Sequence, residues 1–198
     1  ISMLRCTRSS LRSFPGILFF LWPVFLLFSI WIKMDSPGPV FFKQKRVGIH
    51  KSHFEILKFR TMRTDTPKDM PTHLLKDPEQ FITRSGRFLR KTSLDELPQL
   101  LNIVKVDMSI VGPRPALWNQ FDLLEERDKY GANDVVPGLT GWAQIHGRDT
   151  ISIQEKAKLD GYYVEHQSLW LDIKCIFLTI LSVWKREIKL SQHHKVRL

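Results

Sequence analysis

Cysteine is scarce in this sequence, since Cys6 and Cys175 are the only two among 198 residues. One lies in a basic stretch and the other in an apolar helical pattern, so they give neither a disulfide framework nor a metal cluster. Internal repeats and low-complexity tracts are also absent. The simplest interpretation is one reduced domain facing the cytoplasm, because a chain of this length buries one sizeable core but is short for two.

Acidic residues are outnumbered, with 20 Asp and Glu against 30 Lys and Arg, and the formal net charge is +10 at pH 7. Such an excess of positive charge favours an anionic partner. Nucleic acid, an acidic membrane surface and phosphorylated small molecules all qualify. The charge alone does not choose among them, so the positions of particular residues along the chain must decide.

One long stretch without charge lies near the start, at residues 14–32. Its length of roughly 19 residues is enough to cross a hydrocarbon core as a helix. Pro23 removes a helical hydrogen bond in its middle and predicts a kink. Basic residues flank both ends, which the positive-inside tendency places on the cytoplasmic side. These features favour a re-entrant helix over a transmembrane anchor, and a signal peptide is disfavoured because no small-residue cleavage site precedes Lys33.

Short strands and several helices make up the expected body of the chain. Strands are predicted at residues 40–42 and 54–57, with Gly48 in their connection, and a polar loop follows at residues 63–78. Helical patterns occur at residues 85–90, 98–104, 120–129, 153–164 and 169–186. The predicted fold is therefore α+β and mainly helical.

The last predicted helix carries apolar side chains on one side, namely Trp170, Ile173, Phe177, Ile180, Leu181 and Trp184. Its uninterrupted apolar part is too short to span a bilayer. The helix can lie in the membrane interface with its tryptophans at headgroup level, or it can pack against a core. We divide the chain into a membrane-associated segment at residues 1–35, a cytosolic domain at 36–190 and a tail at 191–198.

An acidic pair, Asp95 and Glu96, stands within a strongly basic stretch. Pro98 lacks a backbone N–H and fits best in the first turn of a helix, so a helix is expected to begin just before it. Either Ser93 caps this helix while Glu96 completes a capping box, or Asp95 is itself the cap. Both alternatives place the pair at a helix N-terminus, where free N–H groups and the dipole favour ionised carboxylates and an incoming phosphate.

Positive charge must accompany two carboxylates that meet a diphosphate. Arg84, Arg87 and Arg90 recur every three residues upstream, on roughly one helical face. A Mg²⁺ ion bound by Asp95 and Glu96 would add more positive charge. The competing interpretation is an ordinary capped helix beside a solvated basic face.

Further side chains are candidates for substrate binding, namely Lys58, Arg60, Arg114, Trp142, Gln144 and Arg148. Prolines on both sides hold Arg114 in a stiff loop that suits bidentate phosphate contact. Trp142 offers a ring for stacking on a base or sugar, with Gln144 as a hydrogen-bonding neighbour. Each signal is weak by itself because tight turns use the same residue types.

Together these residues make the chain resemble the monotopic phosphoglycosyl transferases, the bacterial sugar transferase family that primes capsule, O-antigen and glycoprotein glycan assembly. The motifs that carry the resemblance are SPGPVFF (36–42), KFRTM (58–62), TSLDELPQL (92–100), VGPRP (111–115) and PGLTGWAQ (137–144). They occur in the family's order, and the resemblance extends over nearly the whole chain.

The resemblance implies a re-entrant helix broken at Pro23, a catalytic domain on the cytoplasmic face of the bacterial inner membrane, and amphipathic helices at the membrane surface. It also implies a two-step reaction, in which Asp95 attacks the sugar-bearing phosphate of a UDP-sugar and undecaprenyl phosphate then accepts the phosphosugar. Glu96 would bind Mg²⁺ or orient the acceptor. Cations would stabilise the phosphates, namely Lys58, Arg90, Arg114 and Arg148.

Three positions depart from the family's pattern. Residues 12–16 read RSFPG where the family usually carries a basic pair and an Asp, which puts membrane docking in question. Val106 stands where Gly is common, so the turn there is expected to differ or to be strained. His146 replaces a usual Asn and is expected to alter contacts with the donor.

Two other functions were weighed against this enzyme. A non-catalytic basic protein that binds membranes or nucleic acid accounts for the net charge, but not for the acidic pair or the rigid glycine and proline turns. A hydrolase that uses both carboxylates as acid and base would need them farther apart than adjacent residues. The predicted partners are a UDP-sugar, undecaprenyl phosphate and membrane lipids, without nucleic acid. The sequence does not identify the sugar. It also leaves the oligomeric state open, and a homo-oligomer is one of the alternatives.

Overall fold

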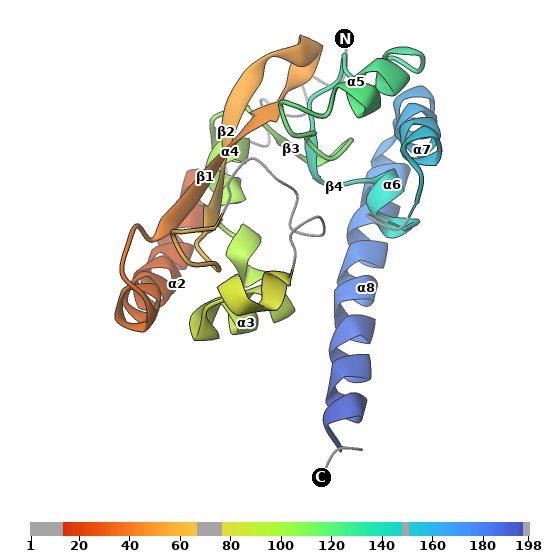
Figure 1. The fold of residues 1–198 in the computed structure, drawn as a ribbon. Coiled ribbons are helices and arrows are strands. Elements are labelled where there is room, and N and C mark those ends of the chain that lie inside the picture. Colours follow the sequence, from red (N-terminus) through yellow and green to blue (C-terminus); the bar gives the residue numbers. More distant parts are fainter. Residues whose placement is uncertain (1–13, 67–76, 148–150, 196–198) are drawn as a thin grey trace. The chain divides into compact units, whose positions relative to one another are not determined.

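The computed structural model of the protein describes residues 14–66, 77–147 and 151–195. The chain folds into two compact units, of which the first comprises residues 1–44 and 56–106 and the second residues 45–55 and 107–198. The chain passes between them within a β-hairpin and again after Val106. Figure 1 labels the main elements of both units.

The first unit is mainly helical. Its elements are α2 (Phe14–Asp35), the outer halves of the hairpin strands β1 (Phe41–Val47) and β2 (His53–Phe59), η4 (Pro78–Phe81), α3 (Arg84–Lys91), η5 (Leu94–Glu96) and α4 (Gln99–Val104). Phe28, Ile32, Phe59 and Leu89 form its core. The Phe59 ring of β2 lies 5.8 Å from that of Phe28 and 5.3 Å from that of Phe25. Helix α2 is therefore packed onto the strand that also carries Lys58.

The C-terminal end of α2 is fixed to the start of α3 by a carboxylate. Asp35 Oδ2 accepts hydrogen bonds from the backbone N–H and the hydroxyl of Ser85, each at 2.8 Å. Burial disfavours the charged form of Asp35, but the bonds from Ser85 and Thr83 and the charge of Arg84 outweigh burial and lower the pKa of the carboxyl. An ionised Asp35 at the first turn of α3 also interacts favourably with the helix dipole.

The second unit contains a short parallel sheet surrounded by helices. Its elements are the turn η2 (Ile49–Lys51), β3 (Ser109–Val111), α5 (Phe121–Asp128), β4 (Gly138–Thr140), α6 (Trp142–Ile145), α7 (Ile153–Glu165) and α8 (Leu169–Lys195). Strands β3 and β4 pair with Ser109 opposite Gly138 and Val111 opposite Thr140. Val111 packs with Tyr163, Leu171 and Cys175 in the core of this unit.

The structure confirms the five predicted helices and the hairpin with Gly48 in its connection. The strands are longer than predicted because they extend beyond the apolar runs and include polar residues, such as Lys43 and Lys45 in β1. The parallel strands β3 and β4 and the short helix α6 were not predicted. Strands of three residues are too short to show the alternation of apolar and polar side chains that marks a strand. The pairing of β3 with β4 also depends on residues far apart in the chain.

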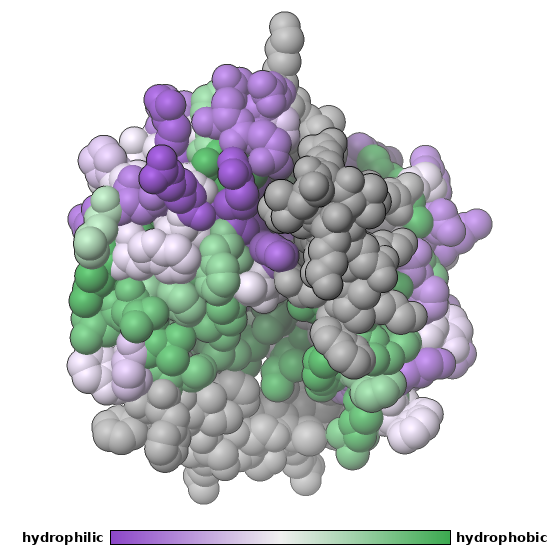
Figure 2. All heavy atoms as spheres, turned by 90° about the horizontal axis from the view of Figure 1, so that it is seen from below, coloured by the Kyte–Doolittle hydropathy of each residue, from purple (hydrophilic) through white to green (hydrophobic). Residues whose placement is uncertain are grey.

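Exposed apolar side chains occur on α2 and α8. They include Trp22, Leu27 and Ile30 on α2 and Trp170, Ile173, Phe177 and Ile180 on α8. Figure 2 colours apolar residues green and shows that many of them are exposed at the surface. Helix α8 also has a buried side, which packs in the core of the second unit through Leu171 and Cys175. The membrane-interface role of its exposed apolar side stays a prediction.

Helix α2 runs without interruption from Phe14 to Asp35 and includes Pro23. Across the residues that the structure describes, no helix has both the length and the apolar character needed to cross a membrane. The re-entrant form of this segment stays a prediction.

Val106 adopts a left-handed backbone conformation, with φ at +66°. The strain expected at this position is therefore confirmed, because a β-branched residue is disfavoured there by about 1–2 kcal/mol. We expect Val106→Gly to raise the free energy of unfolding by about 1 kcal/mol and the thermal midpoint by roughly 3 °C.

The contrasting control is Val104→Gly, two residues earlier within α4. There glycine replaces a partly buried helical residue, so the free energy of unfolding is expected to fall by at least about 1 kcal/mol. Thermal unfolding followed by tryptophan fluorescence measures both. A Val106→Gly protein no more stable than the parent would show that the turn stores no strain.

Candidate active site

The acidic pair lies in the 3₁₀ turn η5, directly before α4. Pro98 is the N-cap of α4, which begins at Gln99. Ser93 precedes the turn in the left-handed region, with φ at +57°, and its side chain makes no capping hydrogen bond. Both predicted caps are therefore wrong. A left-handed Ser93 turns the chain sharply, so that Asp95 and Glu96 enter a tight turn instead of the helix itself.

Glu96 pairs with a lysine of the hairpin instead of completing a capping box. The Lys58 Nζ donates to Glu96 Oε1 at 2.8 Å, and each side chain is only 17% exposed. Partial burial makes this pair stronger than an ion pair at the surface. The pairing brings the end of β2 to the acidic turn, so that Lys58 and Glu96 lie in one cluster.

Arg90 completes the cluster from the last turn of α3. Its Nε donates to the hydroxyl of Thr61 at 2.8 Å, and its Nη2 lies 3.1 Å from the sulfur of Met62. Burial lowers the pKa of Arg90, while the charge of Asp95 acts in the opposite direction. The Thr61 contact holds the guanidinium close enough to Asp95 for their charges to interact.

The pKa of Asp95 is raised, contrary to the expectation that a helix N-terminus would favour its ionised form. Burial is the largest cause, and the neighbouring charge of Glu96 acts in the same direction. Lys58 and Arg90 act against them and favour the carboxylate. The cluster thus contains two carboxyl groups and two cations, and its net charge is close to zero when all four are ionised.

The pair Asp95 and Glu96 offers a divalent ion only part of a binding site. Within the described ranges, no group of three or more His, Cys, Asp or Glu side chains is placed to hold a metal ion. Mg²⁺ commonly takes one or two protein carboxylates and completes its shell with water and substrate phosphates. The two residues fit Mg²⁺ in that way, together with a phosphorylated substrate.

Arg60, another predicted substrate ligand, is almost fully buried in the first unit. Its guanidinium donates to the carbonyl oxygen of Ser36 at 2.7 Å and to that of Pro37. Burial lowers its pKa, and the charge of Asp35 acts against that shift. These contacts tie the end of the hairpin to the segment that follows α2, and the predicted substrate contact of Arg60 stays a prediction.

The second unit holds Arg114, Trp142 and Gln144. Arg114 is partly exposed in its loop. The Trp142 ring stacks on Tyr162, with centroids 5.4 Å apart, and Lys174 Nζ lies 5.2 Å from its centre. Gln144 Nε2 donates to the Leu139 carbonyl at 3.0 Å. These partners give both side chains a structural role, while their predicted donor contacts stay predictions. Arg148 lies outside the described residues.

His146, which replaces a usual Asn, is held at the end of α6. Its Nδ1 lies 2.8 Å from the Trp142 carbonyl oxygen, and its ring centre is 4.3 Å from that of Trp142. These contacts restrain its orientation. The segment 12–16, the other departure from the family's pattern, begins outside the described residues.

Sequence reasoning missed Thr61 and Asp35. Thr61 holds Arg90 through its hydroxyl, and its carbonyl accepts from the Thr83 N–H at 3.1 Å. The KFRTM motif contains Thr61, but we chose only its cations as candidates. Asp35 gave no signal because its partner Ser85 stands 50 residues away.

Comparison with known proteins identifies the family of the chain. Residues 10–186 match the model of a family described as bacterial sugar transferase. The chain therefore belongs to the bacterial sugar transferase family, as the motifs predicted, and the prediction that it is an enzyme is confirmed.

Individual relatives agree with this family. The chain is 46% identical over 161 residues to a Bacillus subtilis (strain 168) protein named uncharacterized sugar transferase EpsL, covering 81% of this chain and 78% of that one. It is 41% identical over 175 residues to the UDP-glucose:undecaprenyl-phosphate glucose-1-phosphate transferase of Escherichia coli (strain K12). That match covers 84% of this chain but 37% of the relative.

A third relative, from Aeromonas hydrophila, is named UDP-N-acetylgalactosamine-undecaprenyl-phosphate N-acetylgalactosaminephosphotransferase. It is 40% identical over 168 residues, which cover 81% of this chain and 39% of the relative. The chain thus spans a little over a third of the length of these two relatives.

Proposed function

We propose that this protein transfers a sugar 1-phosphate from a UDP-sugar to undecaprenyl phosphate and releases UMP, as the first membrane step in the assembly of a surface glycan. The observation that carries the proposal is the cluster of Asp95, Glu96, Lys58 and Arg90, in which a carboxyl group is surrounded by two cations. The names of two relatives from different bacteria support the same donor and acceptor classes.

The reaction proceeds in two displacements at one phosphorus atom. An Asp95 carboxylate oxygen attacks the phosphorus that bears the sugar, the bond from that phosphorus to the UMP oxygen breaks, and UMP leaves. A phosphate oxygen of undecaprenyl phosphate then attacks the same phosphorus and releases Asp95 as a carboxylate. Covalent catalysis of this kind lets a water-soluble donor and a lipid acceptor bind in separate steps.

The neighbouring charges suit each step of this reaction. Lys58 and Arg90 favour the ionised form of Asp95, which is the form that attacks. The same cations stabilise the charge on the phosphate oxygens during both displacements. Glu96 holds Lys58 in place through the 2.8 Å contact, so it acts as an orienting residue as well as an acceptor-binding candidate.

Mg²⁺ is part of the proposal, and Asp95 and Glu96 would hold it together with a substrate phosphate. When bound, the ion would neutralise charge on the diphosphate of the donor. Lys58 already contacts Glu96 Oε1, so this side chain and the ion would share the Glu96 carboxylate.

We further propose that the protein acts at the cytoplasmic face of the bacterial inner membrane and contacts lipid. The exposed apolar residues of α2 and α8 support this location, because side chains such as Trp170 suit the headgroup region of a membrane. The net charge of +10 also favours contact with anionic lipid.

The proposed function is tested with purified protein, undecaprenyl phosphate, Mg²⁺ and a panel of UDP-sugars, scored by UMP release and by the lipid product. We expect one or a few donors to give UMP in an amount equal to the lipid-linked sugar. Absence of UMP release with every donor, combined with salt-sensitive binding of duplex DNA, would favour the non-catalytic alternative. The panel also identifies the sugar.

Lys58 is expected to set the acidic limit of this activity. Because Lys58 lowers the pKa of Asp95, Lys58→Met removes that effect and raises the pKa further. A larger fraction of Asp95 is then protonated and unable to attack, so the acidic limb of the pH profile for UMP release should move to higher pH. Initial rates measured at constant Mg²⁺ over a pH series test this.

The matched control is Lys105→Met, which makes the same change at an exposed position after α4. It should leave the pH profile unchanged. If Lys58→Met lowered the rate by one factor at every pH, the lysine would not control ionisation of Asp95.

A further inference from the structure

The loop that carries Arg114 is held in place by hydrogen bonds to its backbone carbonyl groups. Four consecutive carbonyl groups of the second unit each accept a hydrogen bond. Pro113 accepts from the Gly138 N–H at 2.9 Å and Ala116 from the Val47 N–H at 3.0 Å. The two carbonyls between them accept from arginine side chains, at 3.0 Å for Arg114 and 3.1 Å for Pro115.

Arg127 of α5 is the donor to the Arg114 carbonyl, and it is itself held by Asp160 of α7. Its Nη2 and Nε donate to Asp160 Oδ2 at 2.6 and 2.8 Å. Both side chains are almost completely buried, with 4% and 2% of their surfaces exposed. A planar guanidinium makes these contacts in one fixed orientation, which an ammonium group cannot do.

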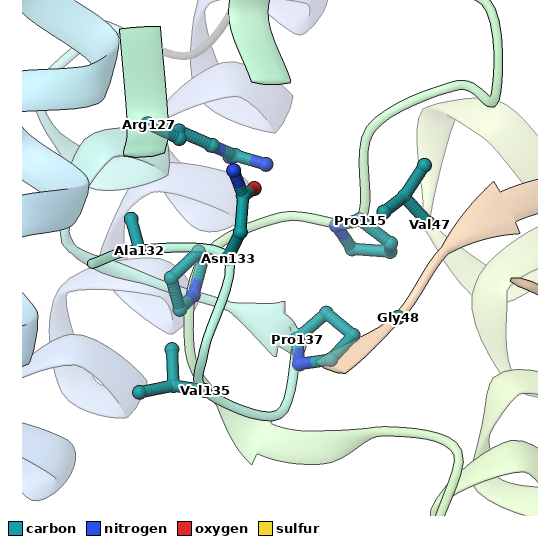
Figure 3. Close-up of a pocket in the computed structure, with 9 residues that line it drawn as sticks. Val47, Gly48, Pro115, Arg127, Ala132, Asn133, Val135 and Pro137 are labelled. Atoms are coloured by element: carbon teal, nitrogen blue, oxygen red, sulfur yellow. The ribbon is translucent and has the colours of Figure 1, made fainter. Parts of the chain in front are cut away.

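A small cavity behind the loop shows how closely this region is packed. Figure 3 shows Arg127 and Asn133 on one side of it and Val47 and Pro115 on the other. Its volume of about 10 Å³ leaves room for no more than about one water molecule. The cavity is therefore too small for a substrate, and its lining residues support the loop.

We propose that the buried pair of Arg127 and Asp160 is a positioning device, which holds the backbone of the loop so that the Arg114 guanidinium is aimed at a phosphate group. Arg127 acts through Arg114 and does not touch the substrate. This inference rests on the proposed function and on the phosphate contact that the sequence and the family resemblance predict for Arg114. The contact to the Arg114 carbonyl distinguishes the pair from one that merely joins α5 to α7.

The first test measures the loop itself, so it does not depend on activity. Arg127→Lys keeps a positive charge near Asp160 but removes the fork that reaches Arg114. Hydrogen–deuterium exchange of the peptide covering residues 112–117 should become at least about fivefold faster. The reason is that the loop loses the hydrogen bond from Arg127 to the Arg114 carbonyl oxygen and opens more often. Unchanged exchange in this peptide overturns the proposal. Exchange in the first unit should not change.

A second variant keeps the proposal testable if the protein with Arg127→Lys does not fold. Arg127→Met combined with Asp160→Leu removes both buried charges together, which commonly preserves folding. It also removes the donor to the Arg114 carbonyl. Faster exchange of residues 112–117 in this double variant supports the proposal, and exchange equal to that of the parent overturns it.

The second test asks whether Arg127 acts through Arg114. We expect Arg127→Lys to lower kcat/KM for UMP release about tenfold in the parent and less than twofold when Arg114→Ala is also present. An equal decrease in both backgrounds overturns the positioning role, because a general loss of packing affects both alike. Lys51→Ala, which removes an exposed ion pair with Asp128 of the same helix, should leave kcat/KM unchanged.

The two proposals fail in different ways. If the parent releases no UMP from any donor, the proposed function is wrong, while the exchange rates still decide whether Arg127 holds the loop. If the parent is active and Arg114→Ala retains full activity, Arg114 does not contact the phosphates and the positioning role is overturned.

Discussion

Asp95→Asn should abolish the release of UMP from a UDP-sugar, with a rate at least about 10³-fold below that of the parent. The amide has nearly the shape of the carboxyl group but lacks the negative oxygen that attacks phosphorus. Its neighbours Lys58 and Arg90 would remain in place, so the loss would be chemical and not a result of unfolding. UMP release with saturating donor and acceptor measures the effect.

Mass spectrometry adds a direct observation of the proposed intermediate. With donor alone, the parent should gain the mass of one phosphosugar, and Asp95→Asn should not. Asp65→Asn is the matched control, since it makes the same substitution at a carboxylate that pairs with Arg63 at the surface. Full turnover by Asp95→Asn would exclude this residue as the nucleophile.

Gly86→Ala should destabilise the first unit by about 3 kcal/mol. A Cβ atom at Gly86 would lie 2.0 Å from the carbonyl oxygen of Thr61 and 2.6 Å from its carbon. Alanine improves intrinsic helix propensity by about 1 kcal/mol, but the clash is with backbone and cannot be relieved by rotating a side chain. The clash therefore outweighs the gain, and α3 must move away from Thr61.

Movement of α3 should also reduce activity, because Arg90 on this helix is held by the Thr61 hydroxyl. Urea unfolding followed by tryptophan fluorescence measures stability, and UMP release measures activity. Gly131→Ala is the control: nothing lies within 4 Å of the added atom, but φ is +63°. Its cost should be only about 1 kcal/mol, from backbone strain. A smaller loss at Gly86 than at Gly131 would contradict the argument.

Local patterns were enough to predict the hairpin and every α-helix of the described residues except the short α6. Apolar residues at 153–164 and 169–186 recur every three or four positions, which is the spacing of a helix. Helices α7 and α8 are found in these two stretches. Pro98 correctly marked where α4 begins, because a proline fits best at the start of a helix, where its missing N–H group costs no hydrogen bond. Local patterns did not predict the parallel pair β3 and β4, since their register is set by residues about 29 positions apart, Ser109 and Gly138.

The environment of the acidic pair could not be predicted from local sequence. The rule for helix caps placed Glu96 against the backbone near Ser93, but the structure places it against Lys58, 38 residues earlier in the chain. The ammonium group of Lys58 gives this carboxylate a charge-assisted hydrogen bond and an ion pair. The same tertiary packing removes water from Asp95 and raises its pKa, where the dipole argument considered only the adjacent turn.

The sequence by itself determined which residues form the acidic pair, which segments are helical and to which family the chain belongs, because these depend on residue types and their short spacings. Only the tertiary structure decided that Lys58 and Arg90 surround Asp95, that Arg60 holds the segment after α2, and that Arg127 holds the Arg114 loop. Each of these contacts joins residues distant in the chain. Burial and charge at such contacts depend on the packing of whole elements, which local spacing does not describe.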